Sequence, residues 1–110
     1  MVIKNITQKN LISAKAKHAN SFSDRLFGLL NPQNPPFLIF KTGLGIHTFF
    51  MKKPIDVILL DGKFRVVKFK ECLKPFGVFL YHPKHSLVIE MPKGTIQKKH
   101  IRKNDKISIE

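Results

Sequence analysis

The stretch Ile55–Phe69, which reads IDVILLDGKFRVVKF, decides the fold class. A largely apolar run leads into Asp61-Gly62, and a second run rich in apolar residues follows. An Asp-Gly pair between two such runs favours a two-residue hairpin turn, because glycine adopts positive φ angles freely and aspartate tolerates them. The sequence therefore predicts an antiparallel hairpin that joins Ile55–Leu60 to Phe64–Phe69.

Most of the remaining chain alternates between short apolar runs and turn residues. Further strands are expected at residues 2–6, 11–16, 37–40, 46–51, 78–81, 87–91 and 107–109. About eight or nine short strands with one embedded helix favour a mainly β (β-rich α+β) fold, a compact jelly-roll-like antiparallel sandwich or barrel. The 110 residues contain no linker or repeat, so a single domain over 1–110 is expected.

One helix is expected near residues 21–30. Apolar residues at positions 22, 26, 29 and 30 follow helical spacing, and Ser21 can cap the first turn. Pro32 ends this helix, because the residue before a proline is pushed out of the helical region. A second, short helix is expected near residues 95–100, with Thr95 as its cap after Gly94.

The charge balance is the most unusual number in the composition. Twenty Lys and Arg residues stand against seven Asp and Glu, which gives a formal net charge of +13. Such an excess attracts polyanions without defining a site. The densest basic segment is the candidate nucleic-acid site, formed by Lys98, Lys99, Arg102, Lys103 and Lys106. No aromatic residue adjoins it in the sequence, and a solvated face is the competing interpretation.

A second candidate site lies in the segment 45–61, which reads GIHTFFMKKPIDVILLD. The strand expected at 46–51 is apolar on both faces, so we expect it to be central and to hold His47 and Thr48 in places where polar groups are costly. Asp56 opens an equally apolar strand. Two alternatives stay open: His47 and Asp56 bond to each other or to backbone and join two strands, or they form a polar pocket with His47 as the ligand-binding group.

Arg25 and Glu90 extend this candidate cleft. Arg25 lies on the flank of the apolar stripe of the expected helix, where its guanidinium needs either water or an acid. Glu90 lies in the apolar strand expected at 87–91 and is the first counterpart, with Asp56 second. The pair is interpreted either as a structural ion pair or as part of a ligand site.

Several classes of site are not expected. Cys72 is the single cysteine, which excludes an internal disulfide and a cysteine-rich zinc site. One histidine and one aspartate fall short of the three or four ligands of a metal, so neither metal nor cofactor is expected. No phosphate loop, nucleophile elbow or HExxH pattern occurs, and no apolar run has membrane length. The polar N-terminal segment predicts an unprocessed, cytoplasmic protein without a signal peptide. Surface positions are expected for the other histidines, His18, His82, His85 and His100.

Linked motifs over nearly the whole chain resemble the family of domain of unknown function 192. The pair IHTFFM and PIDVILLD is similar to the family's IHTFGM and PIDVxFLD signature. The family's A-x-S-F…R-x-x-G-L-(L/M), V-L-E-L-P-A-G and G-(I/L)-x-x-G-D-x-(I/L) motifs are matched in order by Ala19–Leu30, Leu87–Gly94 and Ile101–Ile107.

This resemblance implies a jelly-roll-like β fold with one packed helix and no established activity, and relatives are often exported or lipid-anchored. Gly43 and Gly45 stand where the family often has Cys and Ser, which excludes a cysteine-dependent activity at position 43. Asn104 replaces the glycine of the closing Gly-Asp, so a positive φ is expected there. The family motifs also contain the polar residues of the candidate cleft, namely Arg25, His47, Thr48, Asp56 and Glu90.

Three functional hypotheses follow. The leading one is a non-enzymatic domain that binds an unknown small ligand or protein in the cleft near His47 and Asp56. The first alternative is a polyanion-binding, and specifically nucleic-acid-binding, protein that uses its lysine-rich surface. The second alternative is an enzyme with His47 as general base and Asp56 as the group that orients it.

Overall fold

The computed structural model describes residues 1–18, 37–41, 45–47, 54–74, 78–80 and 87–110. The described strands are β1 (Ile3–Asn5), β2 (Asn10–Ser13), β3 (Lys17–His18), β4 (Leu38–Lys41), β5 (Gly45–His47), β6 (Ile55–Leu60), β7 (Val66–Leu73), β8 (Val78–Leu80), β9 (Leu87–Pro92) and β10 (Ile107–Ile109). One short helix, α2 (Thr95–Lys98), precedes the last strand. The helix expected near 21–30 lies outside the described residues. The mainly β prediction is confirmed.

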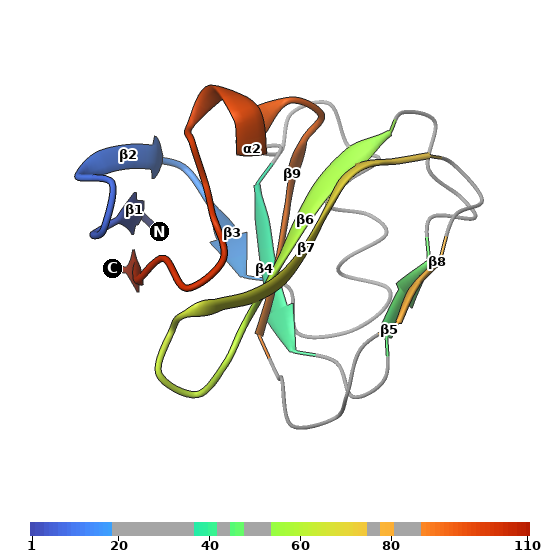
Figure 1. The fold of residues 1–110 in the computed structure, drawn as a ribbon, viewed down its shortest axis with the longest axis horizontal. Helices are drawn as coiled ribbons and strands as arrows, with labels where there is room; N and C mark the ends of the chain where they lie inside the picture. Colours follow the sequence, from blue (N-terminus) through green and yellow to red (C-terminus); the bar gives the residue numbers. More distant parts are fainter. Residues whose placement is uncertain (19–36, 42–44, 48–53, 75–77, 81–86) are drawn as a thin grey trace.

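The strands form three open sheets. The largest has the order β3-β4-β9-β6-β7, and all its neighbours are antiparallel except the β3–β4 pair. A small sheet, β10-β1-β2, joins the two ends of the chain, and β5 pairs with β8. Figure 1 shows the small sheet and the β5–β8 pair on opposite sides of the central sheet. Among the described strands the sheets do not close into a barrel.

The predicted β6–β7 hairpin is present, but the expected two-residue turn is wrong. Asp61 N–H donates to the Arg65 carbonyl at 3.1 Å, and Phe64 N–H donates to the Asp61 carbonyl at 3.0 Å. The loop is therefore longer, and the left-handed residue is Phe64 (φ 61°) rather than Gly62. The reason lies in the Asp61 side chain, whose Oδ1 accepts the Lys63 N–H at 2.8 Å and so builds the turn itself.

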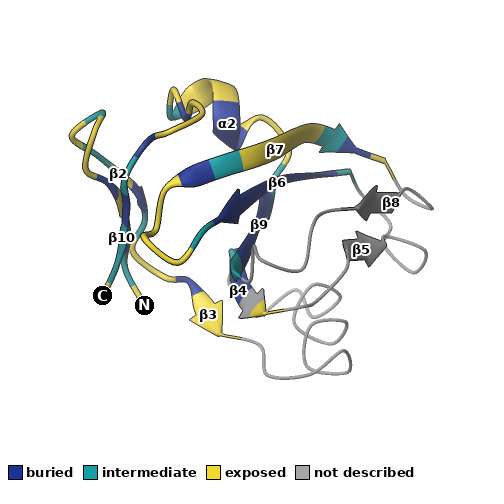
Figure 2. Ribbon diagram, turned by 60° about the horizontal axis from the view of Figure 1, so that its bottom comes forward, coloured by how far each residue is buried: buried dark blue, intermediate teal, exposed yellow. Residues whose placement is uncertain are grey.

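The central strand of the fold is not the one expected from apolar residues on both faces. β5, at the start of the segment 46–51, lies in the two-stranded sheet, whereas β9 and β6 occupy the middle of the large sheet. Every residue of β6 is buried, as the dark ribbon in Figure 2 shows. A strand inside a sheet that is covered on both faces carries apolar residues without alternation.

Each face of the large sheet has its own core. One face packs Ile58 and Leu60 with Ile96 of α2 and with residues of the small sheet such as Ile3. The other face gathers a smaller cluster, which consists of Ile55, Val57, Leu59, Leu73 and Val88. The small sheet and α2 therefore cover the same side of the large sheet, and the side to which a residue of β6 or β9 points decides what it can contact.

Candidate functional site

Asp56, the second residue of β6, is fully buried and bonded on both carboxylate oxygens. Oδ1 accepts the Cys72 N–H of β7 at 2.9 Å. Oδ2 accepts two N–H groups at the start of α2, from Gly94 at 3.1 Å and from Ile96 at 2.9 Å. A carboxylate that accepts several backbone N–H groups offsets the cost of burying its charge.

Local backbone geometry explains why these donors point at Asp56. Ile55 pairs with Leu73 and Val57 with Lys70, so two residues of β7 stand opposite Asp56 in a β-bulge. Cys72 in this bulge has a left-handed φ of 52° and gives its N–H to the carboxylate.

The start of α2 explains the other two donors. Its N-cap is Gly94, which has no side chain to cap the helix, and Asp56 takes that role from a distant strand. The expected capping role of Thr95 is wrong, because its hydroxyl donates to the Pro92 carbonyl at 2.7 Å instead. The helix also ends earlier than expected, at Lys98.

The structure does not bring Asp56 and Glu90 together. Asp56 pairs with Met91 and Val57 with Glu90 across the β6–β9 ladder. Directly opposed residues of antiparallel strands project to the same face, and successive residues to opposite faces. Glu90 is fully buried on the face of Val57, whereas Asp56 lies on the face that α2 covers.

The other residues of the candidate cleft lie wholly or partly outside the described part of the chain. Arg25 and Thr48 lie outside the described residues, and for His47, the last residue of β5, the structure describes the backbone alone. The contacts of Asp56 agree with the structural alternative, in which its carboxylate bonds to backbone. The cleft itself, and an enzyme that uses it, stay predictions.

A third buried carboxylate, Asp105, fixes the closing turn of the chain. Its Oδ2 accepts the Asn5 Nδ2 and the Arg102 N–H, each at 2.8 Å. Gln8 Nε2 lies at 3.4 Å from both carboxylate oxygens, and Asn5 Oδ1 accepts the Gln8 N–H at 3.0 Å. Asn104, just before it, has φ 72°, which confirms the positive φ expected there. The network holds the turn 102–106 against the first strand.

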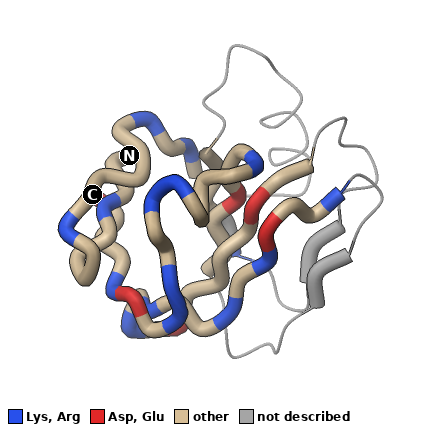
Figure 3. The backbone as a smooth tube through the Cα atoms, turned by 45° about the horizontal axis from the view of Figure 1, so that its top comes forward, with Lys and Arg blue, Asp and Glu red and all other residues tan. Residues whose placement is uncertain are grey.

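The turn 102–106 also lies against the β6–β7 turn, residues 61–65. Ile107 N–H donates to the Phe64 carbonyl at 2.8 Å, and the backbones of Arg65 and Lys106 pair in an antiparallel β-bridge. Side chains add two contacts: Arg65 Nη1 donates to the Asn104 carbonyl at 3.1 Å, and Lys106 Nζ donates to the Lys63 carbonyl at 2.5 Å. Two basic turns far apart in the sequence thus become one surface, whose blue segments meet in Figure 3.

We define the basic–aromatic surface as residues 61–65, Phe69 and residues 98–106. Its exposed cations are Lys63, Arg65, Lys98, Arg102 and Lys103, while Lys99 and Lys106 are half-buried. Phe64 is 41% exposed and Phe69 is 37% exposed. Phe69 pairs with Ile58, which places it on the sheet face that α2 covers.

Sequence reasoning missed these aromatic residues because it considered only neighbours along the chain. The signal that points to them is the run Lys63-Phe64-Arg65 directly after a turn, an aromatic residue between two cations where a core residue is not expected. The predicted basic cluster of residues 98–106 therefore has an aromatic neighbour, contrary to what its sequence context indicated.

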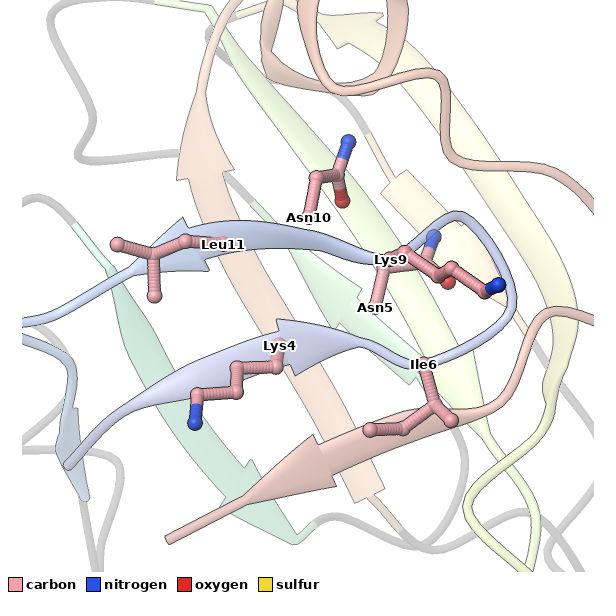
Figure 4. Close-up of a pocket in the computed structure, with 6 residues that line it drawn as sticks. All are labelled: Lys4, Asn5, Ile6, Lys9, Asn10 and Leu11. Carbon is pink, nitrogen blue, oxygen red and sulfur yellow. The ribbon is translucent and has the colours of Figure 1, made fainter.

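A shallow recess of about 490 Å³ lies in the small sheet. Figure 4 shows its lining residues: Lys4, Asn5, Ile6, Lys9, Asn10 and Leu11. Ile6 and Leu11 are about half exposed, and Lys4 forms an ion pair of 3.6 Å with Glu110. The lining contains no acid, histidine or cysteine.

Within the part of the chain that the structure describes, no group of three or more His, Cys, Asp or Glu side chains is arranged to hold a metal ion. No helix among the described residues is long and apolar enough to cross a membrane.

Comparisons with solved structures show that this fold is shared. A protein of unknown function from Novosphingobium aromaticivorans superposes with a TM-score of 0.77 at 14% identity, over 98% of this chain and 82% of that one. A protein from Sinorhizobium meliloti, described as a candidate transcription regulator, gives 0.78 at 15% identity, over 97% and 89% of the two chains. At these identities the likeness concerns the fold.

Sequence comparisons identify the family. The UPF0127 protein of Pyrococcus horikoshii is 36% identical over 93 residues, which cover 78% of this chain and 80% of the relative. That of Thermococcus kodakarensis is 36% identical over an alignment of 116 positions, which covers 97% of this chain and 72% of the relative. The sequence model of the DUF192 family, which is described as "Uncharacterized ACR", matches residues 3–109. The chain therefore belongs to the DUF192 family.

Proposed function

We propose that this chain is a nucleic-acid-binding protein that works through the basic–aromatic surface. The observation that carries the proposal is the contact between the turns 61–65 and 102–106. The backbone β-bridge of Arg65 with Lys106 and the hydrogen bond from Ile107 N–H to the Phe64 carbonyl form this contact. This contact converts charge that is spread along the sequence into a local concentration of cations, which is what a phosphate backbone recognises.

The same region contains two acids, Asp61 and Asp105, and the carboxylates of both accept hydrogen bonds that build its turns. The Asp105 carboxylate is 3% exposed and bonded to Asn5, Gln8 and the Arg102 N–H. Asp61 Oδ1 accepts the N–H groups of Lys63 and Arg65. Both carboxylates thus accept N–H groups within the turns, while Lys63, Arg102 and Lys103 are exposed. The basic–aromatic surface holds seven Lys and Arg residues against two Asp, so its net charge is positive.

The described geometry favours this function over ligand binding in the cleft. Asp56, one of the two residues that defined the cleft, has both oxygens engaged by backbone N–H groups. Glu90 points to the other side of the sheet. The basic–aromatic surface, in contrast, consists of described residues, and the fold joins its two turns, 61–65 and 102–106, from distant parts of the chain.

The test compares two triple variants of equal charge. Lys98→Gln, Arg102→Gln and Lys103→Gln remove exposed cations from the surface, and Lys15→Gln, Lys17→Gln and Lys41→Gln remove exposed lysines elsewhere. Binding of a labelled mixed-sequence oligonucleotide is measured by anisotropy at several salt concentrations. Each lost phosphate contact makes the negative slope of log K against log salt shallower by about 0.7 to 0.9. We therefore expect the slope of the first variant to be shallower by about 2 and the slope of the control to stay almost unchanged.

Equal losses in both variants would contradict the proposal, because they would mean that any lysine of the chain serves as well as those of the surface. Circular dichroism of both variants checks that the fold is intact.

A further inference from the structure

Large exposed hydrophobic side chains form two groups in the described part of the chain. Met1, Ile6 and Leu11 belong to the N-terminal segment, and Phe64 and Phe69 belong to the β6–β7 hairpin. Only the second group is aromatic, and it lies within the basic–aromatic surface. Aromatic rings among cations are the combination on which unpaired bases stack.

Phe64 occupies a backbone position that its side chain does not favour. Its φ of 61° is left-handed, a region that bulky residues avoid and that glycine or asparagine normally fills. The residue is 41% exposed, so burial compensates for this conformation only in part. Strained residues of this kind concentrate at functional sites.

The backbone of Phe64 is nevertheless held firmly. Its N–H donates to the Asp61 carbonyl at 3.0 Å, and its carbonyl accepts the Ile107 N–H at 2.8 Å. A ring carried on a fixed backbone loses little freedom when a ligand stacks on it, which favours binding.

Phe69 supplies a second ring on the same hairpin. It lies in the middle of β7, the edge strand of the large sheet, and is 37% exposed. Phe69 follows Phe64 by five residues, so at about 3.3 Å per residue their α-carbons lie at most roughly 16 Å apart. Two rings on one hairpin offer stacking surfaces for two bases.

We infer that the nucleic acid bound here is single-stranded, with bases stacked on Phe64 and Phe69 while the cations of the surface hold the phosphates. A duplex conceals the faces of its bases and can use only the cations. This inference rests on the proposed function and adds the substrate class, because charge alone does not separate single strands from duplexes or from other polyanions.

The first test needs no variant. The intact protein is titrated with a mixed single-stranded 12-mer, with an abasic 12-mer of the same length and charge, and with heparin. We expect at least a tenfold weaker binding of the abasic strand, since stacking contributes roughly a factor of ten per base. Equal affinity for the two strands would overturn the inference.

The second test uses Phe64→Leu and Phe69→Leu, which keep an apolar side chain and remove the ring. We expect the double variant to bind the 12-mer at least tenfold more weakly and to bind the corresponding duplex within twofold of the original protein. Leu11→Ala, an exposed apolar position outside the surface, is the control and should change neither. Melting curves confirm that each variant is folded.

The outcomes separate the inference from the function on which it rests. Binding that depends on Lys98, Arg102 and Lys103 but not on the rings would overturn the single-strand inference and leave the proposed function standing. Absence of saturable binding to every oligonucleotide would overturn both.

Discussion

The carboxylate of Asp56 connects three pieces of backbone: a buried strand, a bulge in its neighbour and the start of a helix. Its position in an apolar run marks it as exceptional in the sequence. The partners cannot be predicted from that run, because Cys72 and Gly94 become donors only through left-handed backbone conformations in separate elements. A polar residue in an apolar strand thus reveals a network without revealing whether a ligand takes part.

Replacing Asp56 by asparagine should destabilise the fold by about 3 kcal/mol, because an amide nitrogen would face at least one buried N–H donor and the charge-assisted bonds would be lost. For a domain of this size that corresponds to a fall in melting temperature of about 10 °C or more. Thermal denaturation of Asp56→Asn measures it. The matched control is Asp61→Asn, where an exposed turn keeps an oxygen acceptor; similar small shifts in both variants would contradict the role given to Asp56.

Asn104 permits a test of the positive φ at the closing turn. At φ 72°, glycine is free of strain and alanine is not. Asn104→Gly should therefore change the free energy of unfolding by less than about 1 kcal/mol, while Asn104→Ala should lower it by about 1 kcal/mol or more. Urea denaturation of the two variants decides this, and a more stable alanine variant would be inconsistent with a left-handed residue here.

At the scale of elements, local patterns predicted strands well where the chain is apolar. β6 and β10 were predicted at their observed bounds, and β8 and β9 nearly so, because short apolar runs bounded by turn residues define them. β3 was missed, since two exposed polar residues carry no pattern. The longer β6–β7 turn was also missed, because the side chain of Asp61 rather than the flexibility of Gly62 shapes it.

The candidate cleft shows the limit of the same approach. Asp56 and Glu90 are both buried acids in neighbouring strands, and each was identified from its apolar context. Only the register of the β6–β9 ladder shows that they point to opposite faces, since a shift of one residue would reverse the result. Register depends on packing across the sheet, which a single sequence does not display.

The Asn5–Asp105 hydrogen bond should couple the first strand to the closing turn. Because both residues are buried and joined at 2.8 Å, a double-mutant cycle of Asn5→Ala and Asp105→Ala should give an interaction free energy of about 1 kcal/mol or more. Chemical denaturation of the four proteins measures it. Asn5→Ala combined with Asp56→Asn should be additive, because the Asp56 carboxylate bonds to Cys72, Gly94 and Ile96 instead; coupling in that pair and none in the first would refute the assignment.

For the whole molecule, the question is whether a net charge of +13 acts diffusely or at one place. The fold gathers part of this charge at one place, because it joins the turns 61–65 and 102–106, and it leaves Phe64 exposed in the first of them. No pattern in the sequence links these turns, which lie some forty residues apart and meet only through the sheet arrangement.

The most direct test is an amide-resolved NMR titration of the intact protein with a short single-stranded oligonucleotide, at low and at near-physiological salt. Binding at the basic–aromatic surface predicts saturable shifts confined to residues 61–70 and 97–107, weakened by salt but still present at the higher concentration. Shifts spread over lysines throughout the chain, or shifts that vanish at physiological salt, would contradict a nucleic-acid site and reduce the positive charge to a general property of the surface.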